Sequence, residues 1–220
     1  MKLTTFAAAL TLCMAAAPAL AAEPVEIDSR LDALAAGWAH ANYQVQDKSA
    51  RAAEAAKVAA QADGLAKQNP GRAEPLVWEA IALATEGGAE GGLKGLGHAK
   101  AAKALLERAE QMNPKALGDG SVYTSLGSLY AAVPGFPIGF GDAGKARAYL
   151  QKALAVNPTG IDPNYFYGDF LMHQGDYAGA VRALERAVAA PQRPGRAVAD
   201  QGRREEAQVL LAQARAKLRG

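Results

Sequence analysis

The sequence is poor in the residues that metal binding and thiol chemistry require. Its 220 residues include one cysteine, Cys13, and three histidines, His40, His98 and His173. No two of these histidines stand three or four positions apart, the spacing that places two metal ligands on one face of a helix. We therefore expect no structural zinc site. We also expect no thiol chemistry, because Cys13 lies in a segment that we expect to be removed on export.

The motifs of several enzyme classes are also missing. Ser121, Ser125 and Ser128 do not stand in a Gly-x-Ser-x-Gly sequence, so a serine hydrolase is not indicated. The stretch around Gly91-Gly92 lacks the Gly-Lys-Ser/Thr ending of a phosphate-binding loop. The sequence thus predicts a protein that is not an enzyme and that needs no metal or cofactor.

An excess of either charge is absent as well. Lys and Arg number 24 and Asp and Glu number 22, which gives a formal net charge of +2. A nucleic-acid binder needs a basic surface to neutralise phosphates, so we expect no nucleic-acid partner. Half of the residues are hydrophobic and 21% are charged, which are the proportions of a packed globular protein.

The long apolar run of a membrane anchor is missing too. The run from Leu3 to Ala17 is shorter than the roughly 20 residues of a transmembrane helix. Lys2 precedes this run, and Pro18 and the small-residue triplet Ala19-Leu20-Ala21 follow it. These features are typical of a secretory signal peptide, residues 1–21, cleaved after Ala21. We expect a soluble protein that is periplasmic or otherwise exported and has no membrane span after cleavage.

Cys13 raises the alternative of a lipid-anchored protein. The residue before it, Leu12, is bulky at a position where lipoprotein signals have a small residue. The sequence therefore favours a soluble exported protein over a lipoprotein.

What the sequence does contain is a repeat. Asn-Pro pairs stand at Asn69-Pro70, Asn113-Pro114 and Asn157-Pro158, separated each time by 44 residues. Each pair follows a segment with helical spacing of small and apolar residues. A period of this length predicts an array of helical repeats.

A small-large-small pattern recurs within these segments at spacings of four and three, which places all three residues on one helical face. The alanines of such a triad let a neighbouring helix approach closely, and the leucine fills the space between them. Five residues before each triad stands a glycine, Gly97, Gly141 or Gly175, which suits the turn between paired helices. The triads are Ala102-Leu106-Ala109, Ala146-Leu150-Ala153 and Ala180-Leu184-Ala187.

The last unit resembles the tetratricopeptide repeat, whose pattern is Leu-Gly, Tyr, Gly-Asp-Tyr, Ala, Phe, Ala and Pro. This resemblance implies an all-α fold, a tetratricopeptide-like helical-hairpin array that forms an alpha-alpha superhelix. The matching residues are Tyr167-Gly168, Leu171, Gly175-Asp176-Tyr177, Ala180, Leu184, Ala187 and Pro191.

The repeats divide the chain after the signal peptide. We predict a helical repeat array over residues 22–192 and a linker with a capping helix over 193–220. The capping helix should run from Ala197 to Leu218 and use Val209, Leu210, Ala214 and Leu218 as its apolar side. The four units span about 28–70, a degenerate unit with Val58, Ala62 and Leu65 in place of the triad, and then 73–114, 119–158 and 161–192.

Two units carry an insertion at the turn between their helices. Gly127 and Gly141 are fourteen residues apart, where the last unit has seven, and Ala82 and Gly97 are fifteen apart. We expect the two insertions to lie side by side on one edge of the array. The first insertion carries the apolar residues Phe136, Ile138 and Phe140, which either form a binding edge for a partner or ligand or fold back as a plug.

Repeat arrays commonly bind through the concave face that their first helices line. The predicted groove is acidic, hydroxylic and partly apolar, and it lacks the Lys, Arg and Asn residues of domains that clamp a carboxylate terminus. Tyr165 and Met172 have the alternative of packing between units. The groove positions are Glu79, Leu83, Glu86, Thr124, Ser128, Ala131, Tyr165, Asp169, Met172 and His173.

The export signal, the repeats and the enlarged turns together resemble the periplasmic T-component of tripartite ATP-independent (TRAP) transporters. This family is associated with extracytoplasmic solute-binding proteins, so the resemblance implies a non-catalytic protein with a protein partner of that kind. A small apolar ligand is compatible with the same resemblance. The alternative is a structural adaptor in cell-envelope assembly that binds no small molecule.

Overall fold

The computed structural model describes residues 24–219 of the chain, and this part is helical almost throughout. The predicted signal peptide lies outside the described residues. None of the described helices is long and apolar enough to cross a membrane. The elements are α1 (Pro24–Ala39), continued by the π-helical turn η1 (His40–Gln44), then α2 (Lys48–Gln68), α3 (Glu74–Glu90), α4 (Gly92–Met112), α5 (Ser121–Ala132), α6 (Ala143–Val156), α7 (Ile161–His173), α8 (Tyr177–Ala189) and α9 (Ala197–Arg219).

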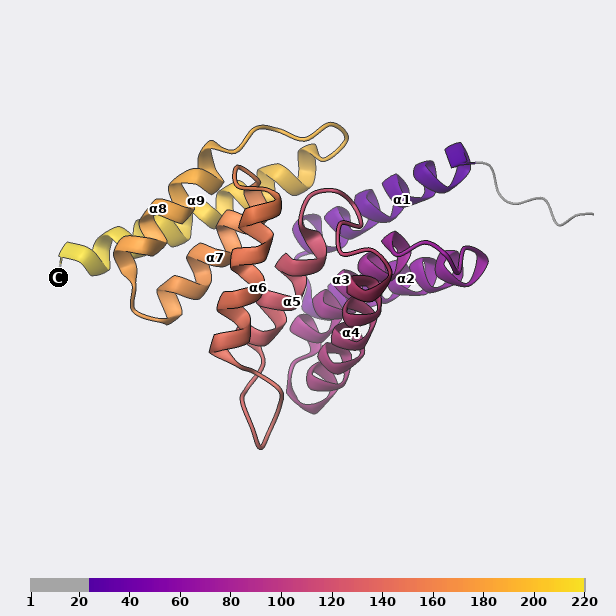
Figure 1. The fold of residues 1–220 in the computed structure, drawn as a ribbon, viewed down its shortest axis with the longest axis horizontal. Coiled ribbons are helices and arrows are strands. Elements are labelled where there is room, and N and C mark those ends of the chain that lie inside the picture. The colour runs from indigo at the N-terminus through magenta and orange to yellow at the C-terminus, as the bar shows by residue number, and fades with distance from the viewer. Residues whose placement is uncertain (1–23, 220) are drawn as a thin grey trace, which may run out of the picture.

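Successive helices pair into hairpins that stack along the molecule (Figure 1). The pairs are α1–η1 with α2, α3 with α4, α5 with α6, and α7 with α8, and each pair also contacts the next. The predicted all-α helical repeat array is therefore confirmed.

The Asn-Pro pairs end the second helix of a hairpin, as the 44-residue period predicts. Asn69, Asn113 and Asn157 are the C-terminal caps of α2, α4 and α6. The backbone N–H of each donates to a carbonyl oxygen in the last helical turn, at 2.8 to 3.0 Å. The proline that follows has no amide hydrogen and disfavours helical geometry in the residue before it, so the helix stops there.

The three predicted triads form the centre of the hairpins. All nine side chains of these triads have no solvent exposure. In two of these hairpins the first helix approaches the leucine through a glycine: a Cβ atom on Gly127 would lie 2.6 Å from Cγ of Leu150, and one on Gly168 would lie 2.6 Å from Cγ of Leu184. The inter-helix role of the triads is confirmed.

One predicted turn is wrong. Residues 86–97 do not form a loop, because α3 continues to Glu90 and α4 begins at Gly92. The chain reverses at Gly91 and Gly92, whose φ angles are +67° and +58°, and Gly97 lies inside α4. Gly87 and Gly95 permit close packing of the two helices, since a Cβ atom on Gly95 would clash with the carbonyl oxygen of Gly87.

The insertion that carries Phe136, Ile138 and Phe140, residues 133–142, is a true loop that projects beyond the helices at the bottom of Figure 1. It closes on itself at Gly141, where a Cβ atom would collide with the carbonyl oxygen of Val133. Leu96 of α4 lies beside Gly139 of this loop. The two insertions are thus neighbours on one edge, as predicted, although one lengthens its helices and the other does not.

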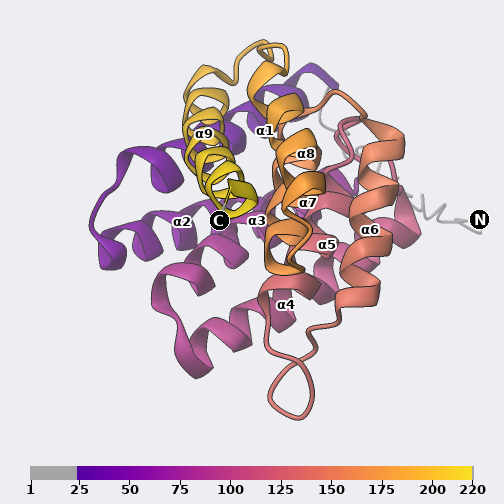
Figure 2. The ribbon, with the colours of Figure 1, turned by 90° about the vertical axis from the view of Figure 1, so that its left-hand side faces the viewer.

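The C-terminal helix α9 packs on α8 and α7, and it also contacts α1 and η1 at the other end of the chain (Figure 2). Its predicted apolar side is wrong in part, because Val209 is 61% exposed and Leu218 is 52% exposed. The buried stripe is offset from the predicted one because α9 packs on α1 and η1 as well as on α7 and α8. It consists of Ala199, Arg203, Ala207, Leu211 and Ala214.

Candidate functional site

The helix α9 packs on α7 and α8 at the last unit of the array and also contacts α1 and η1 of the first unit. Gly202 of α9 lies directly against Tyr43 of η1, so closely that a Cβ atom at Gly202 would lie 2.2 Å from the tyrosine ring. The Tyr43 hydroxyl also donates to Oε2 of Glu206 at 3.5 Å. The groove of the array is therefore bridged between its two ends by a segment of its own chain.

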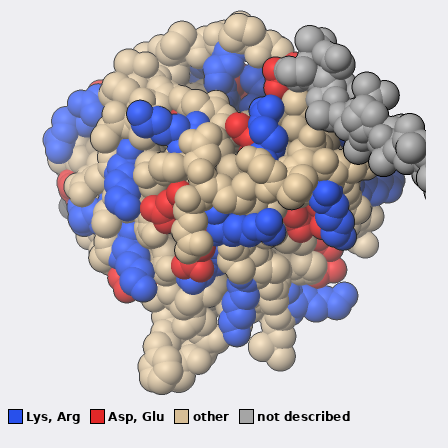
Figure 3. All heavy atoms as spheres, turned by 45° about the vertical axis from the view of Figure 1, so that its right-hand side comes forward, with Lys and Arg blue, Asp and Glu red and all other residues tan. Residues whose placement is uncertain are grey.

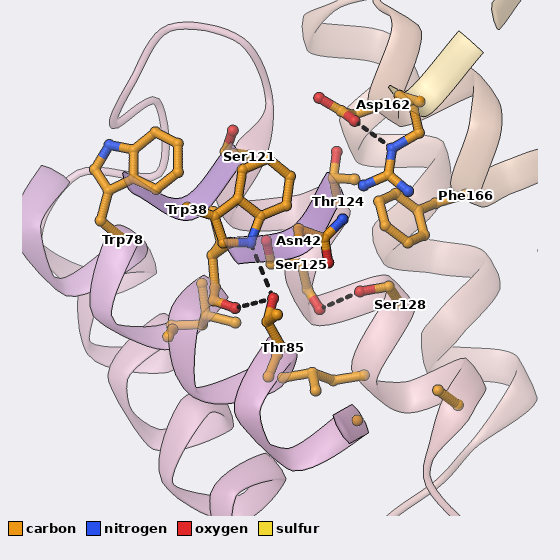
Figure 4. A pocket seen from close by; sticks show the side chains of 18 of the residues that line it. Trp38, Asn42, Trp78, Thr85, Ser121, Thr124, Ser125, Ser128, Asp162 and Phe166 are labelled. Carbon is orange, nitrogen blue, oxygen red and sulfur yellow. Dashed lines mark hydrogen bonds and ion pairs between the residues drawn. The ribbon is translucent and has the colours of Figure 1, made fainter. Parts of the chain in front are cut away.

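A cavity of about 360 Å³ lies between this bridge and the first helices of the four units. Its apolar wall includes Trp38 of α1, Trp78 and Ile81 of α3, Leu129 of α5 and Phe166 of α7 (Figure 4). The two tryptophan rings are 6.1 Å apart between centroids. The volume is within the range of cavities that hold small organic molecules.

Hydroxyl groups line another part of the same wall, mainly from α5. The indole Nε1 of Trp38 donates to Oγ1 of Thr85 at 2.9 Å. Thr124 donates to the carbonyl oxygen of Gly120, and Ser128 donates to that of Ser125, both at 3.0 Å. Because the hydroxyl hydrogens of Thr124 and Ser128 bond within their own helix, their oxygens remain as acceptors toward the cavity.

One end of the cavity is closed by ion pairs between α7, the linker and α9. Asp162 accepts from Nε of Arg203 at 2.8 Å and from Nη1 of Arg193 at 2.9 Å. Arg203 also donates to Glu206 at 2.6 Å, and Arg193 donates to the buried carboxylate of Asp200. Burial alone would raise the pKa of Asp162, but the charges of Arg203 and Arg193 hold it below its usual value. Asp162 is thus ionised at neutral pH.

Arg203 is the central residue of this cluster. It is 7% exposed, and its guanidinium lies 4.5 Å from the ring centroid of Tyr165 and 4.6 Å from that of Phe166. A buried guanidinium is stable only when carboxylates and hydrogen bonds compensate its charge. Here Asp162 and Glu206 do so, which fixes α9 against α7.

The structure places two of the predicted groove residues, Thr124 and Ser128, in the cavity wall. The predicted positions on α3 face elsewhere. Glu79 lies among charged residues of α2 and α4, and Leu83 packs against the core, whereas Ile81 and Thr85 face the cavity. Adjacent helical positions point about 100° apart, so a shift of one or two positions moves a residue to another face.

The predicted positions on α7 lie outside the cavity as well. Tyr165 and Asp169 line a separate hollow on the other side of α9, and burial raises the pKa of Tyr165 to about 12. Met172 packs against the core, as the alternative interpretation proposed. His173 is exposed and its Nδ1 lies 2.9 Å from the carbonyl oxygen of Asp169, and Ala131 is exposed.

The structure brings Glu86 together with Glu90 and His98 across the extended α3–α4 hairpin. Nε2 of His98 lies 3.1 Å from Glu90, and Nδ1 lies 3.6 Å from Glu86. One ligand atom from each residue lies within 4.8 Å of the others, a grouping that could hold a cation. The spacing argument missed it because the three residues come from two helices.

The insertion edge combines exposed apolar residues with one that is half-buried. Phe136 is 94% exposed and Ile138 is 66% exposed, and Leu93 at the neighbouring turn is 87% exposed. Phe140 instead packs edge-on against Tyr130, with ring centroids 5.6 Å apart. This lower end of the molecule is an uncharged projection, in contrast to the mixed Lys, Arg, Asp and Glu residues above it (Figure 3).

Sequence reasoning missed most of the cavity. Trp38, Trp78, Phe166, Asp162 and Arg203 were not among the predicted site residues. One signal was present: Arg203 interrupts the small and apolar stripe of α9, where an isolated arginine needs a buried carboxylate.

Comparisons with known proteins agree with this architecture. Residues 138–199 match the family model for the tetratricopeptide repeat. The crystal structure of a thermophilic tetratricopeptide-repeat protein from Thermus thermophilus aligns with a TM-score of 0.55 at 19% identity, covering 86% of this chain and 93% of that chain. Among curated proteins, no sequence matches the chain. These matches establish a tetratricopeptide-like helical array.

Proposed function

We propose that this tetratricopeptide-like array is a non-catalytic binding protein whose cavity holds a small, largely apolar molecule. The observation that carries the proposal is the contact of α9 with the first unit, which joins the two ends of the array beside a cavity lined by α1, α3, α5 and α7. The volume of this cavity, about 360 Å³, suits a small molecule.

The composition of the wall supports the same proposal. Trp38, Trp78 and Phe166 bring aromatic rings to the wall, with 7% of Trp38 and 3% of Trp78 exposed, and an apolar wall favours an apolar ligand by removing it from water. Hydroxyl oxygens on α5 add a few polar contacts that can orient it. Both tryptophans of the sequence line the cavity, so their fluorescence reports directly on its occupancy.

Filling the cavity should abolish binding without unfolding the protein. Ser125 lies on the cavity wall, so Ser125→Phe places a ring in the volume that a ligand would use. We expect octan-1-ol to change the tryptophan fluorescence of the wild type. We expect its affinity for Ser125→Phe to be at least about tenfold lower.

The matched control is Ala131→Phe, which puts the same ring at an exposed position of the same helix outside this cavity. This control should bind octan-1-ol as the wild type does. Equal affinity of octan-1-ol for all three proteins would contradict the proposed cavity.

The proposal extends to the compartment. Lys2, the apolar run that follows it and the triplet Ala19-Leu20-Ala21 support export with cleavage after Ala21. A cavity protein in the periplasm would carry or sense a solute there. The more specific role of a TRAP-transporter T-component, with a solute-binding protein as partner, depends on the sequence features alone, because both matches are to tetratricopeptide repeats in general.

A protein partner is the second candidate, and the insertion edge favours it. Leu93, Phe136 and Ile138 expose adjoining apolar surface, which is the composition of a protein-binding patch. A structural adaptor without any small ligand would use the same edge.

The double variant Phe136→Ser with Ile138→Ser separates binding from stability. Both side chains are exposed, so the free energy of unfolding should change by no more than about 0.5 kcal/mol. Recovery of a partner from envelope extract should nevertheless be lost. The control Phe140→Ser should instead destabilise the fold, since Phe140 packs against Tyr130. Undiminished recovery of the partner with the double variant would exclude this edge.

A further inference from the structure

Arg196, in the linker directly before α9, places a guanidinium on the cavity wall without an acceptor. Its Nε is buried and has no hydrogen-bond partner among the described residues. The contact that holds the group is with the face of Trp78, whose ring centroid lies 5.0 Å from Cζ. A buried donor without an acceptor is costly, and an oxygen atom of a ligand can remove that cost.

Three nearby carboxylates attract the charge of Arg196, but none of them accepts a hydrogen bond from it. The nearby carboxylates of Asp162 and Asp200 accept hydrogen bonds from Arg193, and that of Asp119 accepts one from Ser121. Burial and the like charge of Arg193 lower the pKa of Arg196. An anion beside Arg196 would relieve both the missing hydrogen bonds and the repulsion between the two guanidinium groups.

A second arginine, Arg51 of α2, also stands on the described part of the cavity wall, where its Nε donates to the carbonyl oxygen of Val45. The hydroxyl groups of Thr124 and Ser128 donate within their helix, whereas the side chains of Asn42 and Ser125 donate to no other described residue. Figure 4 shows Asn42 and Ser125 in the middle of the cavity. The buried donor without an acceptor belongs to Arg196, because the Nε of Arg51 is already bonded, so we place a single anionic group of the ligand at Arg196.

We infer that the ligand is an amphipathic monocarboxylic acid, with its carboxylate on Arg196 and its apolar tail between Trp38, Trp78 and Phe166. The planar fork of a guanidinium matches the two oxygens of a carboxylate. The inference rests on the proposed ligand-binding function, since it names the class of molecule for the same cavity.

The test compares two probes of equal length at neutral pH, octanoate and octanamide, which differ in the charge of the head group. Their affinities for the purified protein are measured by tryptophan fluorescence. Octanoate should bind the wild type at least about tenfold more tightly than octanamide. In Arg196→Gln the two affinities should agree within about twofold, whereas Arg215→Gln, which removes an exposed arginine of α9, should keep the preference.

The outcomes separate this inference from the proposed function. If octanamide and octanoate bind the wild type equally, or if the preference survives in Arg196→Gln, the cavity binds ligands but the carboxylate assignment is wrong. If neither probe nor octan-1-ol binds, the proposed function itself is wrong, and the inference falls with it. A crystal structure of the wild type with octanoate adds a measurement that does not depend on the folding of a variant. A carboxylate bound away from Arg196 would overturn the assignment.

Discussion

Replacement of Arg203 by alanine is expected to lower the free energy of unfolding by about 3–5 kcal/mol. The change removes a buried cation and leaves Asp162 with Arg193 as its remaining partner. It also removes the guanidinium that packs on Tyr165 and Phe166. Since these contacts join α9 to α7, chemical denaturation of the variant should show an earlier midpoint.

The control for this substitution is Arg215→Ala on the same helix. Arg215 also forms an ion pair, with Glu185 at 2.7 Å, but both side chains are about half exposed. An exposed pair of this kind contributes about 0–1 kcal/mol, so the loss should be small. Similar losses for the two variants would show that Arg203 does not hold α9 in place.

Replacement of Leu150 by alanine should cost about 2–5 kcal/mol, in the upper part of that range. The leucine has no solvent exposure and fills the space opposite Gly127, which has no side chain that could move into the void. Urea denaturation of the variant measures the loss directly.

Gln151→Ala is the matched control, because Gln151 is the next residue of α6 and is exposed. Its effect should stay within about 0.5 kcal/mol. Glu206, which the sequence presents as a surface residue of α9, is unsuitable as a control because it accepts from Arg203. A small loss from Leu150→Ala would contradict the position of the triads at the centre of the hairpins.

The parts of the fold that the sequence predicted are those with short-range causes. Each of the triads at residues 102–109, 146–153 and 180–187 has helical spacing within eight residues. Each triad therefore lies within a single helix. The Asn-Pro pairs act on the helix that they end. The triads and the Asn-Pro pairs can be recognised without knowing which distant residues they contact. The helices and their pairing into hairpins could therefore be predicted from them.

The cavity could not be predicted in the same way because distant residues make it. Trp38 and Arg203 face one space only because α9 returns to the first unit, and no periodic signal records that return. The extension of α3 and α4 up to Gly91 was not predicted for a different reason. Glycine has a low intrinsic helix propensity, and there the close packing of Gly87 on Gly95 outweighs it.

The contact between Gly202 and Tyr43 also changes how the array loses its structure. An open array can fray from either end, since each terminal repeat is held by one neighbour. In this protein α9 also contacts α1 and η1, so detachment of the first repeat breaks its contacts with α9 as well as those with the second repeat. Amide hydrogens in α1 and α9 should therefore exchange with solvent in a common opening event. The contact of α9 with α1 and η1 would then make the first and last helices of the described array one cooperative unit.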